Sequence, residues 1–158
     1  MLATIEKHLL ICVSKFFHEL SGIGIAAEKG RHSLDGFNPA KYTFSTELSG
    51  HFQGICFLNC AQETAEELAN LMFQEEEDFE MDEEMVFETG MEVLNTVIGR
   101  SIGQLSREDL KIKMAPPEYY TDYNFVEKKV NLHIPFKTRL GYLHIILQSK
   151  DNESSQSS

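Results

Sequence analysis

Four residues on one predicted helix are of types that could act together on a partner molecule. On a helix over residues 85–105, Glu88, Glu92, Asn95 and Gly99 fall within about 60° of one another, because successive residues turn by about 100°. The asparagine amide is neutral and both donates and accepts hydrogen bonds, so it could orient a water molecule. The glycine would let a partner approach closely. An ordinary solvated helix face is the simple alternative.

The residue types argue for more than a solvated surface. Asparagine is a poor residue for a helix interior, and glycine there costs about 1 kcal/mol relative to alanine. Asn95 and Gly99 nevertheless lie one turn apart on the same face. The opposite face is predicted to pack on the core, with Val86, Val93 and Val97 flanked by Leu94 and Leu105. The hypothesis therefore requires an exposed Asn95 with open space in front of it.

Apolar periodicity predicts the elements that must position this helix. Helical spacing predicts two further helices over 2–20 and 62–73, and alternation predicts strands over 42–48, 51–59, 110–114, 126–136 and 141–148. Residues 25–40 are rich in turn-forming residues and are expected to hold a strand fragment at most. Because hairpins imply antiparallel pairing, we predict an α+β fold. It has a single domain over residues 1–149, with an antiparallel-rich sheet and the three helices packed on it.

The net negative charge of the chain argues against some classes of binding partner. The chain has 158 residues, with 14 Lys and Arg against 25 Asp and Glu, for a net charge of −11. Nucleic acids and anionic membranes are bound through clustered basic residues, so neither is expected as a partner. Eight of the acids fall within the ten residues 75–84, which indicates a solvated link whose acids favour the start of the next helix. A patch that attracts a basic partner is the alternative. The polar residues 150–158 are predicted to form a disordered tail.

The cysteine and histidine residues show no metal-binding or nucleophilic pattern. The cysteines Cys12, Cys56 and Cys60 are interpreted as buried apolar thiols, and their odd, low number suits a reducing compartment. The histidines have no spacing typical of metal ligands, so no metal site is expected. No apolar stretch approaches the roughly 20 residues of a spanning helix, and we see no signal peptide. The predicted location is therefore the cytoplasm.

The segment MEVLNTVIG at residues 91–99 resembles the E-x-x-N helix of the CheC/CheX/FliY phosphatases of bacterial chemotaxis. The surrounding order is also similar to CheX-type members: a glycine-containing hairpin at 49–54, a helix, an acidic stretch, and prolines at 116 and 117 after the E-x-x-N helix. A single E-x-x-N motif favours the CheX type over the two-site CheC type. Two departures stand out: Glu88 occupies a position where the family usually has Asp or Ser, and the prolines follow Asn95 at a slightly shorter distance.

The resemblance implies a phosphatase that hydrolyses the aspartyl-phosphate of a CheY-like receiver domain. It implies that Asn95 orients the attacking water and that Glu92 pairs with a lysine of the receiver. Glu88, Thr96 and Gly99 are then expected to contact the receiver. The receiver would supply Mg²⁺, and this chain would bind no cofactor. CheX-type proteins form homodimers, so a dimer is expected, and the edges of the final predicted hairpin could pair.

Two other functions stay open at the level of sequence. The first is a catalytically silent CheX-like module that binds a receiver domain as an adaptor, which the unusual Glu88 favours. The second is an unrelated α+β interaction protein that uses the acidic residues 75–84 to dock a basic surface.

Overall fold

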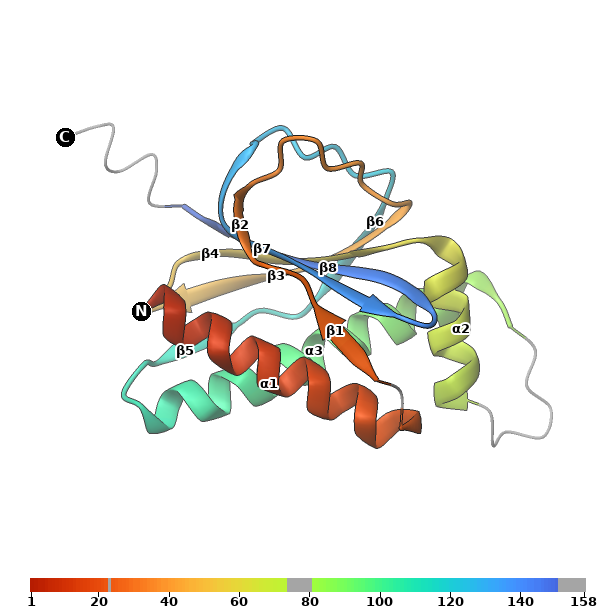
Figure 1. The fold of residues 1–158 in the computed structure, drawn as a ribbon, viewed down its shortest axis with the longest axis horizontal. Coiled ribbons are helices and arrows are strands. Elements are labelled where there is room, and N and C mark those ends of the chain that lie inside the picture. The colour runs from red at the N-terminus through yellow and green to blue at the C-terminus, as the bar shows by residue number, and fades with distance from the viewer. Residues whose placement is uncertain (23, 74–80, 151–158) are drawn as a thin grey trace.

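Three helices pack on an eight-stranded antiparallel sheet in the computed structural model, which describes residues 1–22, 24–73 and 81–150 (Figure 1). The helices are α1 (Leu2–Ser21), α2 (Gln62–Phe73) and α3 (Glu83–Arg107). The strands are β1 (Ile25–Ala27), β2 (Arg31–Ser33), β3 (Tyr42–Gly50), β4 (Gly54–Cys60), β5 (Ile112–Met114), β6 (Glu118–Thr121), β7 (Lys129–Thr138) and β8 (Gly141–Ser149). This arrangement confirms the predicted α+β fold.

The main core lies between the sheet and the helices α1 and α3. The sheet order is β1-β7-β8-β4-β3-β5, with β2 also paired to β7 and β6 to β3. Phe44, Ile134 and Phe136 of the sheet are completely buried there, against helix residues such as Phe17 and Leu94. Burial of these apolar side chains supplies most of the free energy that holds α3 in place.

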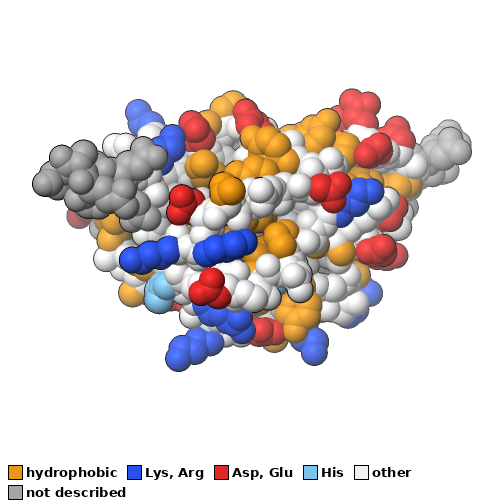
Figure 2. All heavy atoms as spheres, turned by 90° about the horizontal axis from the view of Figure 1, so that it is seen from above, with side chains coloured by type: hydrophobic (Ala, Val, Ile, Leu, Met, Phe, Trp, Pro, Cys, Tyr) orange, Lys and Arg blue, Asp and Glu red, His pale blue; other side chains and the backbone are white. Residues whose placement is uncertain are grey.

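A second, smaller core lies on the other face of the sheet. Figure 1 shows the segments on either side of β2 and before β7 rising over the face that points away from α1 and α3. They bury Leu34, Phe57, Phe125, Val130 and Ile146. The outer surface of this layer carries both signs of charge, with Lys and Arg mostly at the lower left of the view and Asp and Glu toward its right end (Figure 2).

A hydrogen bond and an ion pair join α1 to α3, and the two helices run in opposite directions. Glu108, at the end of α3, forms a hydrogen bond with His8 near the start of α1. Arg100 pairs with Glu19, near the other end of α1, at 3.0 Å between Nη1 and Oε2. α1 therefore covers the C-terminal half of α3 along one side.

Several predicted element boundaries were wrong, each for a local reason. Residues 25–40 were expected to hold a strand fragment at most, but they contain both β1 and β2, and β2 pairs with β7 although its side chains are mostly exposed. The short strand β6 was not predicted, because all its residues are exposed and carry no apolar alternation. β5 starts at Ile112 instead of residue 110, because the chain first turns through Asp109, whose φ is 63°. β7 starts at Lys129 instead of residue 126.

The expectation that the final hairpin has free edges was also wrong. β7 pairs with β1 and β2 on one side and with β8 on the other, and β8 lies between β7 and β4. The hairpin is thus interior to the sheet, and the homodimer stays a prediction without this support. Residues 74–80 of the predicted acidic link and 151–158 of the predicted tail lie outside the described residues. Within the described ranges, no helix has the length and apolar character needed to span a membrane.

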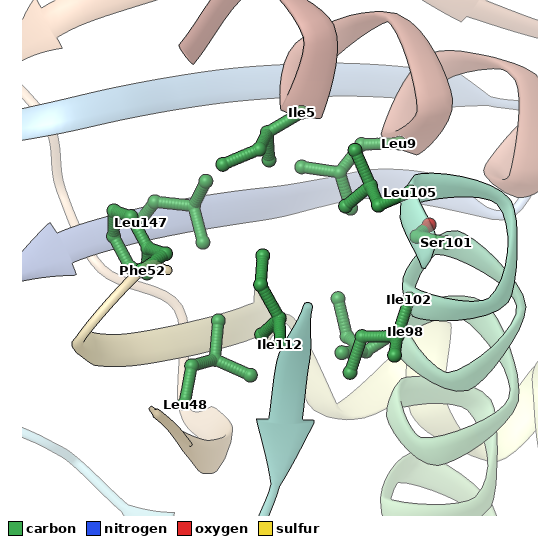
Figure 3. A pocket seen from close by; sticks show the side chains of 10 residues that line it. All are labelled: Ile5, Leu9, Leu48, Phe52, Ile98, Ser101, Ile102, Leu105, Ile112 and Leu147. Carbon is green, nitrogen blue, oxygen red and sulfur yellow. The ribbon is translucent and has the colours of Figure 1, made fainter. Parts of the chain in front are cut away.

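A small cavity remains between α1, α3 and the sheet (Figure 3). Its volume is about 20 Å³, and apolar side chains such as Ile5, Leu9 and Ile98 point into it. The one hydroxyl in the lining, that of Ser101, donates to the carbonyl of Val97 at 2.8 Å. A space of this size holds about one water molecule and offers it no free polar partner. We therefore attribute the cavity to core packing and assign it no substrate.

Candidate functional site

Helix α3 carries the predicted site and begins at a strong N-cap. The Asp82 side chain accepts a hydrogen bond from the backbone N–H of Met85 at 2.8 Å. Glu83 and Glu84 occupy the first turn, where the helix dipole favours negative charge. The interpretation that these acids favour the start of the helix is therefore confirmed for the part of the acidic stretch that is described.

The rotation of α3 about its axis is fixed by its apolar face. The residues predicted to face the core are all buried: Val86, Val93, Leu94, Val97 and Leu105. Gly90 also lies on the buried side, where a Cβ atom would come within 2.0 Å of the Phe44 ring. This glycine lets α3 approach β3 closely. The packing turns the opposite face of the helix toward solvent.

The four residues of the predicted stripe are exposed together. Glu88, Glu92, Asn95 and Gly99 all lie on the solvent side of α3. The first three line an open groove of about 670 Å³. The space around Gly99 is open, since a Cβ atom there would meet nothing within 4 Å. The requirement that Asn95 be exposed beside free space is met.

The opposite wall of the groove comes from the last residue of β5 and the three residues after it. This segment, residues 114–117, consists of Met114, Ala115, Pro116 and Pro117, and Met91 of α3 completes the lining. In the sequence, Pro116 and Pro117 follow the strand predicted at 110–114, but nothing in the pattern indicates that they lie close to Asn95. That proximity depends on β5 pairing with β3 beneath α3, which no local sequence signal reveals.

One hydrogen bond orients a carboxylate in the groove. The half-buried Thr96 donates its hydroxyl to Oε1 of Glu92 at 3.1 Å, one turn along the helix. In the described parts of the chain, neither Glu88 nor Glu92 forms an ion pair with a cation. The Asn95 amide likewise makes no hydrogen bond within the same residues. The groove thus presents two unpaired carboxylates and a free amide to an incoming molecule.

Other reactive residue types lie away from this groove. Cys12, Cys56 and Cys60 are buried free thiols, as interpreted from the sequence. Burial raises the pKa of both Cys56 and Cys60 to about 12, so neither is a thiolate near neutral pH. Among the described residues, no group of three or more His, Cys, Asp or Glu could hold a metal ion.

The fold has close counterparts among solved structures. The chemotaxis protein CheX of Desulfovibrio desulfuricans superposes with a TM-score of 0.78 at 17% identity, over 92% of this chain and 99% of that chain. CheX of Vibrio vulnificus also gives 0.78 at 17% identity, over 91% and 97%. A CheX–CheY–BeF₃–Mg²⁺ complex from Borrelia burgdorferi gives 0.71 at 23% identity, over 90% and 97%. At such identities the likeness shows the fold alone.

The family is shown by the sequence itself. No curated protein sequence matches the chain. The family model for the chemotaxis phosphatase CheX, however, matches residues 42–137. This match spans more than half of the chain and includes the part of α3 that carries Glu92 and Asn95, together with the proline wall that faces them. The chain therefore belongs to the CheX family of chemotaxis phosphatases.

Proposed function

We propose that this protein hydrolyses the aspartyl-phosphate of a CheY-like receiver domain, with Asn95 and Glu92 as the residues that act on it. The observation that carries the proposal is the position of Asn95, exposed in an open groove beside Glu92. Family membership supports the reaction, and the Borrelia burgdorferi CheX, whose complex contains CheY and Mg²⁺, supports the class of partner.

Asn95 has the chemistry to position the nucleophile. In the reaction, the oxygen of a water molecule bonds to phosphorus while the bond between phosphorus and the aspartate oxygen breaks. The products are the receiver's free carboxylate and inorganic phosphate, which retains the protons of the water. Such transition states require positioning more than acid–base catalysis. A neutral amide enters a phosphate site without repulsion and can hold the water in line with the leaving oxygen.

Glu92 is suited to anchoring the complex. A carboxylate is repelled by a phosphoryl group, so its place in the site requires a cation on the partner. Thr96 occupies Oε1 of Glu92, which leaves the second oxygen for the lysine of the receiver. Mg²⁺ would be held by the receiver and would neutralise the phosphoryl oxygens there. This chain contributes the water-orienting amide and the anchoring carboxylate.

A silent module that binds receivers without hydrolysis is the second candidate. It is favoured by Glu88, a carboxylate that lines the groove without a cation partner among the described residues, at a position where the family usually has Asp or Ser. An additional negative charge at this place could hinder the approach of the phosphoryl group. The two candidates share the fold and the partner and differ only in turnover.

The decay of a phosphorylated receiver separates the candidates. We expect the wild-type chain to accelerate the release of phosphate and Asn95→Ala to lose at least about 100-fold of that acceleration, since a positioning group is removed. The exposed location of Asn95 predicts an unchanged melting temperature for the variant. Binding of the receiver without faster phosphate release would establish the silent module instead. Equal rates for wild type and variant would exclude the role of Asn95.

The location of the protein and its oligomeric state are proposed as the sequence predicts them. We propose that the protein acts in the cytoplasm and forms a homodimer. Sedimentation of the purified chain tests the second statement directly. Because β7 and β8 are interior to the sheet, a dimer formed by strand pairing would need an outer strand such as β6.

A further inference from the structure

The wall of the groove opposite Asn95 is a second recognisable surface, formed by residues 114–117 and called here the proline ridge. It separates two hollows. On one side lies the groove with Glu88, Glu92 and Asn95, and on the other lies a hollow of about 450 Å³ lined by Ser45, Glu47 and Glu118. The ridge thus projects between two carboxylate-bearing surfaces at the place where a partner must approach Asn95.

The proline ridge is rigid before any partner binds. The backbone N–H of Ala115 donates to the carbonyl of Glu47 at 2.9 Å, and the hydroxyl of Thr46 donates to the carbonyl of Ala115 at 2.6 Å. Both polar groups of the Ala115 backbone are therefore held by β3. Pro116 and Pro117 then fix their own φ angles and have no N–H to donate. A surface that is already ordered loses little conformational entropy on binding.

The groove side of the ridge is apolar. Met91 and Met114 are half-buried, and with Ala115 and the two prolines they form the apolar part of the groove lining. Methionine side chains are flexible and adapt to differently shaped apolar groups. Because the prolines offer no N–H, this wall cannot extend a β-sheet through them. The wall is therefore better suited to contacting an apolar side chain of a partner than to pairing with a partner's β-strand.

The carboxylates around the groove indicate which charges a partner should carry beside its apolar side chain. Among the described residues, Glu88 and Glu92 flank the groove without a paired cation, and Glu118 on the far side of the ridge accepts a hydrogen bond from the hydroxyl of Tyr120 at 2.6 Å. Glu47 pairs with Lys150 at 3.3 Å. A partner that fits both properties carries an apolar side chain flanked by cations.

We propose that the proline ridge and Met91 form a docking wall that takes an apolar side chain of the receiver, located beside the receiver's phosphorylated aspartate and next to its lysine. This inference rests on the proposed function, because it takes the receiver as the occupant. The wall sets affinity and the choice of receiver, whereas Asn95 sets the rate of the chemical step.

Binding and turnover of a receiver test the docking wall separately. The probe is a CheY-like receiver that carries beryllium fluoride as a phosphoryl mimic, titrated with the full chain. The double variant Met91→Gln with Met114→Gln keeps side-chain length and removes apolar surface, and we expect its Kd to rise about tenfold. Pro116→Ser changes an exposed residue, so the fold is kept, and we expect its Kd to rise about threefold through loss of rigidity and apolar contact.

Two matched variants serve as controls. Ile11→Gln changes an exposed apolar residue on α1, and Pro39→Ser changes an exposed proline in the loop between β2 and β3. Both should leave Kd unchanged. With phosphorylated receiver, the ridge variants (the double methionine variant and Pro116→Ser) should raise KM, while kcat stays within about twofold of the wild type. Asn95→Ala, in contrast, should lower kcat.

The possible failures are distinguishable. If the wild-type chain binds the receiver without accelerating phosphate release, the proposed reaction fails, and weaker binding by the ridge variants still supports the wall. If the wild type is active and Pro116→Ser and the methionine variant bind as tightly as it does, the wall is overturned and the reaction stands. A change in the oligomeric state with unaltered receiver binding would assign the ridge to a second copy of the chain, and would also overturn the inference. So would a wild-type chain that does not bind the receiver.

Discussion

At the scale of single residues, the candidate site combines a neutral amide with carboxylates that pair with no cation in the described part of the chain. Asn95 is the one group in the stripe that can face a phosphoryl group without repulsion and still hold a water molecule. Glu92 requires an external cation, and the described chain offers it none. These charges therefore suit Asn95 to orienting the water and Glu92 to binding the receiver's lysine. To bind the lysine, the Glu92 side chain must be held in a defined rotamer.

The hydroxyl of Thr96 is the group that holds Glu92. It donates to Oε1 of Glu92 at 3.1 Å from one turn further along α3. Thr96→Val removes the donor and keeps the shape of the half-buried side chain. We expect KM for the phosphorylated receiver to rise about threefold with kcat nearly unchanged, because one exposed hydrogen bond contributes roughly 0.5–1 kcal/mol. Steady-state measurement of phosphate release gives both constants.

Thr96→Ser provides the matched control. Serine keeps the hydroxyl and loses only a methyl group, so it should retain a KM close to that of the wild type. If valine leaves KM at the wild-type value, the hydroxyl is not needed, and Thr96 does not act through Glu92.

At the scale of elements, replacing glycine by alanine should have opposite effects on stability on the two faces of α3. Gly90 is buried against the ring of Phe44, whereas a Cβ atom at Gly99 would meet open space. We expect Gly90→Ala to lower the free energy of unfolding by about 2 kcal/mol through overpacking. Gly99→Ala should raise it by up to about 1 kcal/mol through better helix propensity. Urea unfolding of both variants measures the two changes on one helix.

The functional role of Gly99 predicts a second, separable result. If the receiver approaches α3 closely at this position, Gly99→Ala should weaken receiver binding while it stabilises the free protein. Titration of the receiver with the variant checks this. A variant that is more stable and binds the receiver normally would show that Gly99 lowers helix stability without contacting the receiver.

The structure also indicates which elements a sequence can and cannot predict. The long helix and its two faces follow from residue periodicity, because burial of Val86, Val93 and Val97 leaves only one orientation for Asn95. The strands β2 and β6 escape prediction because they are short, exposed and held by pairing with distant strands. For the same reason, the sequence predicted one side of the site and missed the proline ridge, whose position depends on long-range sheet pairing.

At the scale of the whole molecule, the sheet separates the candidate site from a second core that holds a histidine pair. Nε2 of His133 and Nδ1 of His144 are 3.0 Å apart, and the ring of Phe37 lies 4.8 Å from each imidazole. Burial lowers the pKa of both histidines to about 4, with a smaller contribution from the charge of Arg31 at His133 and from His133 itself at His144. Glu28 opposes these effects at both residues.

The histidine pair predicts acid sensitivity of the whole fold. In the unfolded chain these imidazoles take up protons below a pKa of about 6.5, whereas the folded chain keeps them neutral down to about 4. Stability from the neutral pair is therefore complete above about pH 6.5 and declines as the pH falls toward 4. Between pH 7.5 and 5 the free energy of unfolding should fall by about 4 kcal/mol, with about 2 kcal/mol from each histidine, above the range in which most carboxylates titrate. Urea unfolding across this range measures the slope, and a double variant with His133→Gln and His144→Gln should lose most of it. An equal slope in that variant would place the acid sensitivity elsewhere in the molecule.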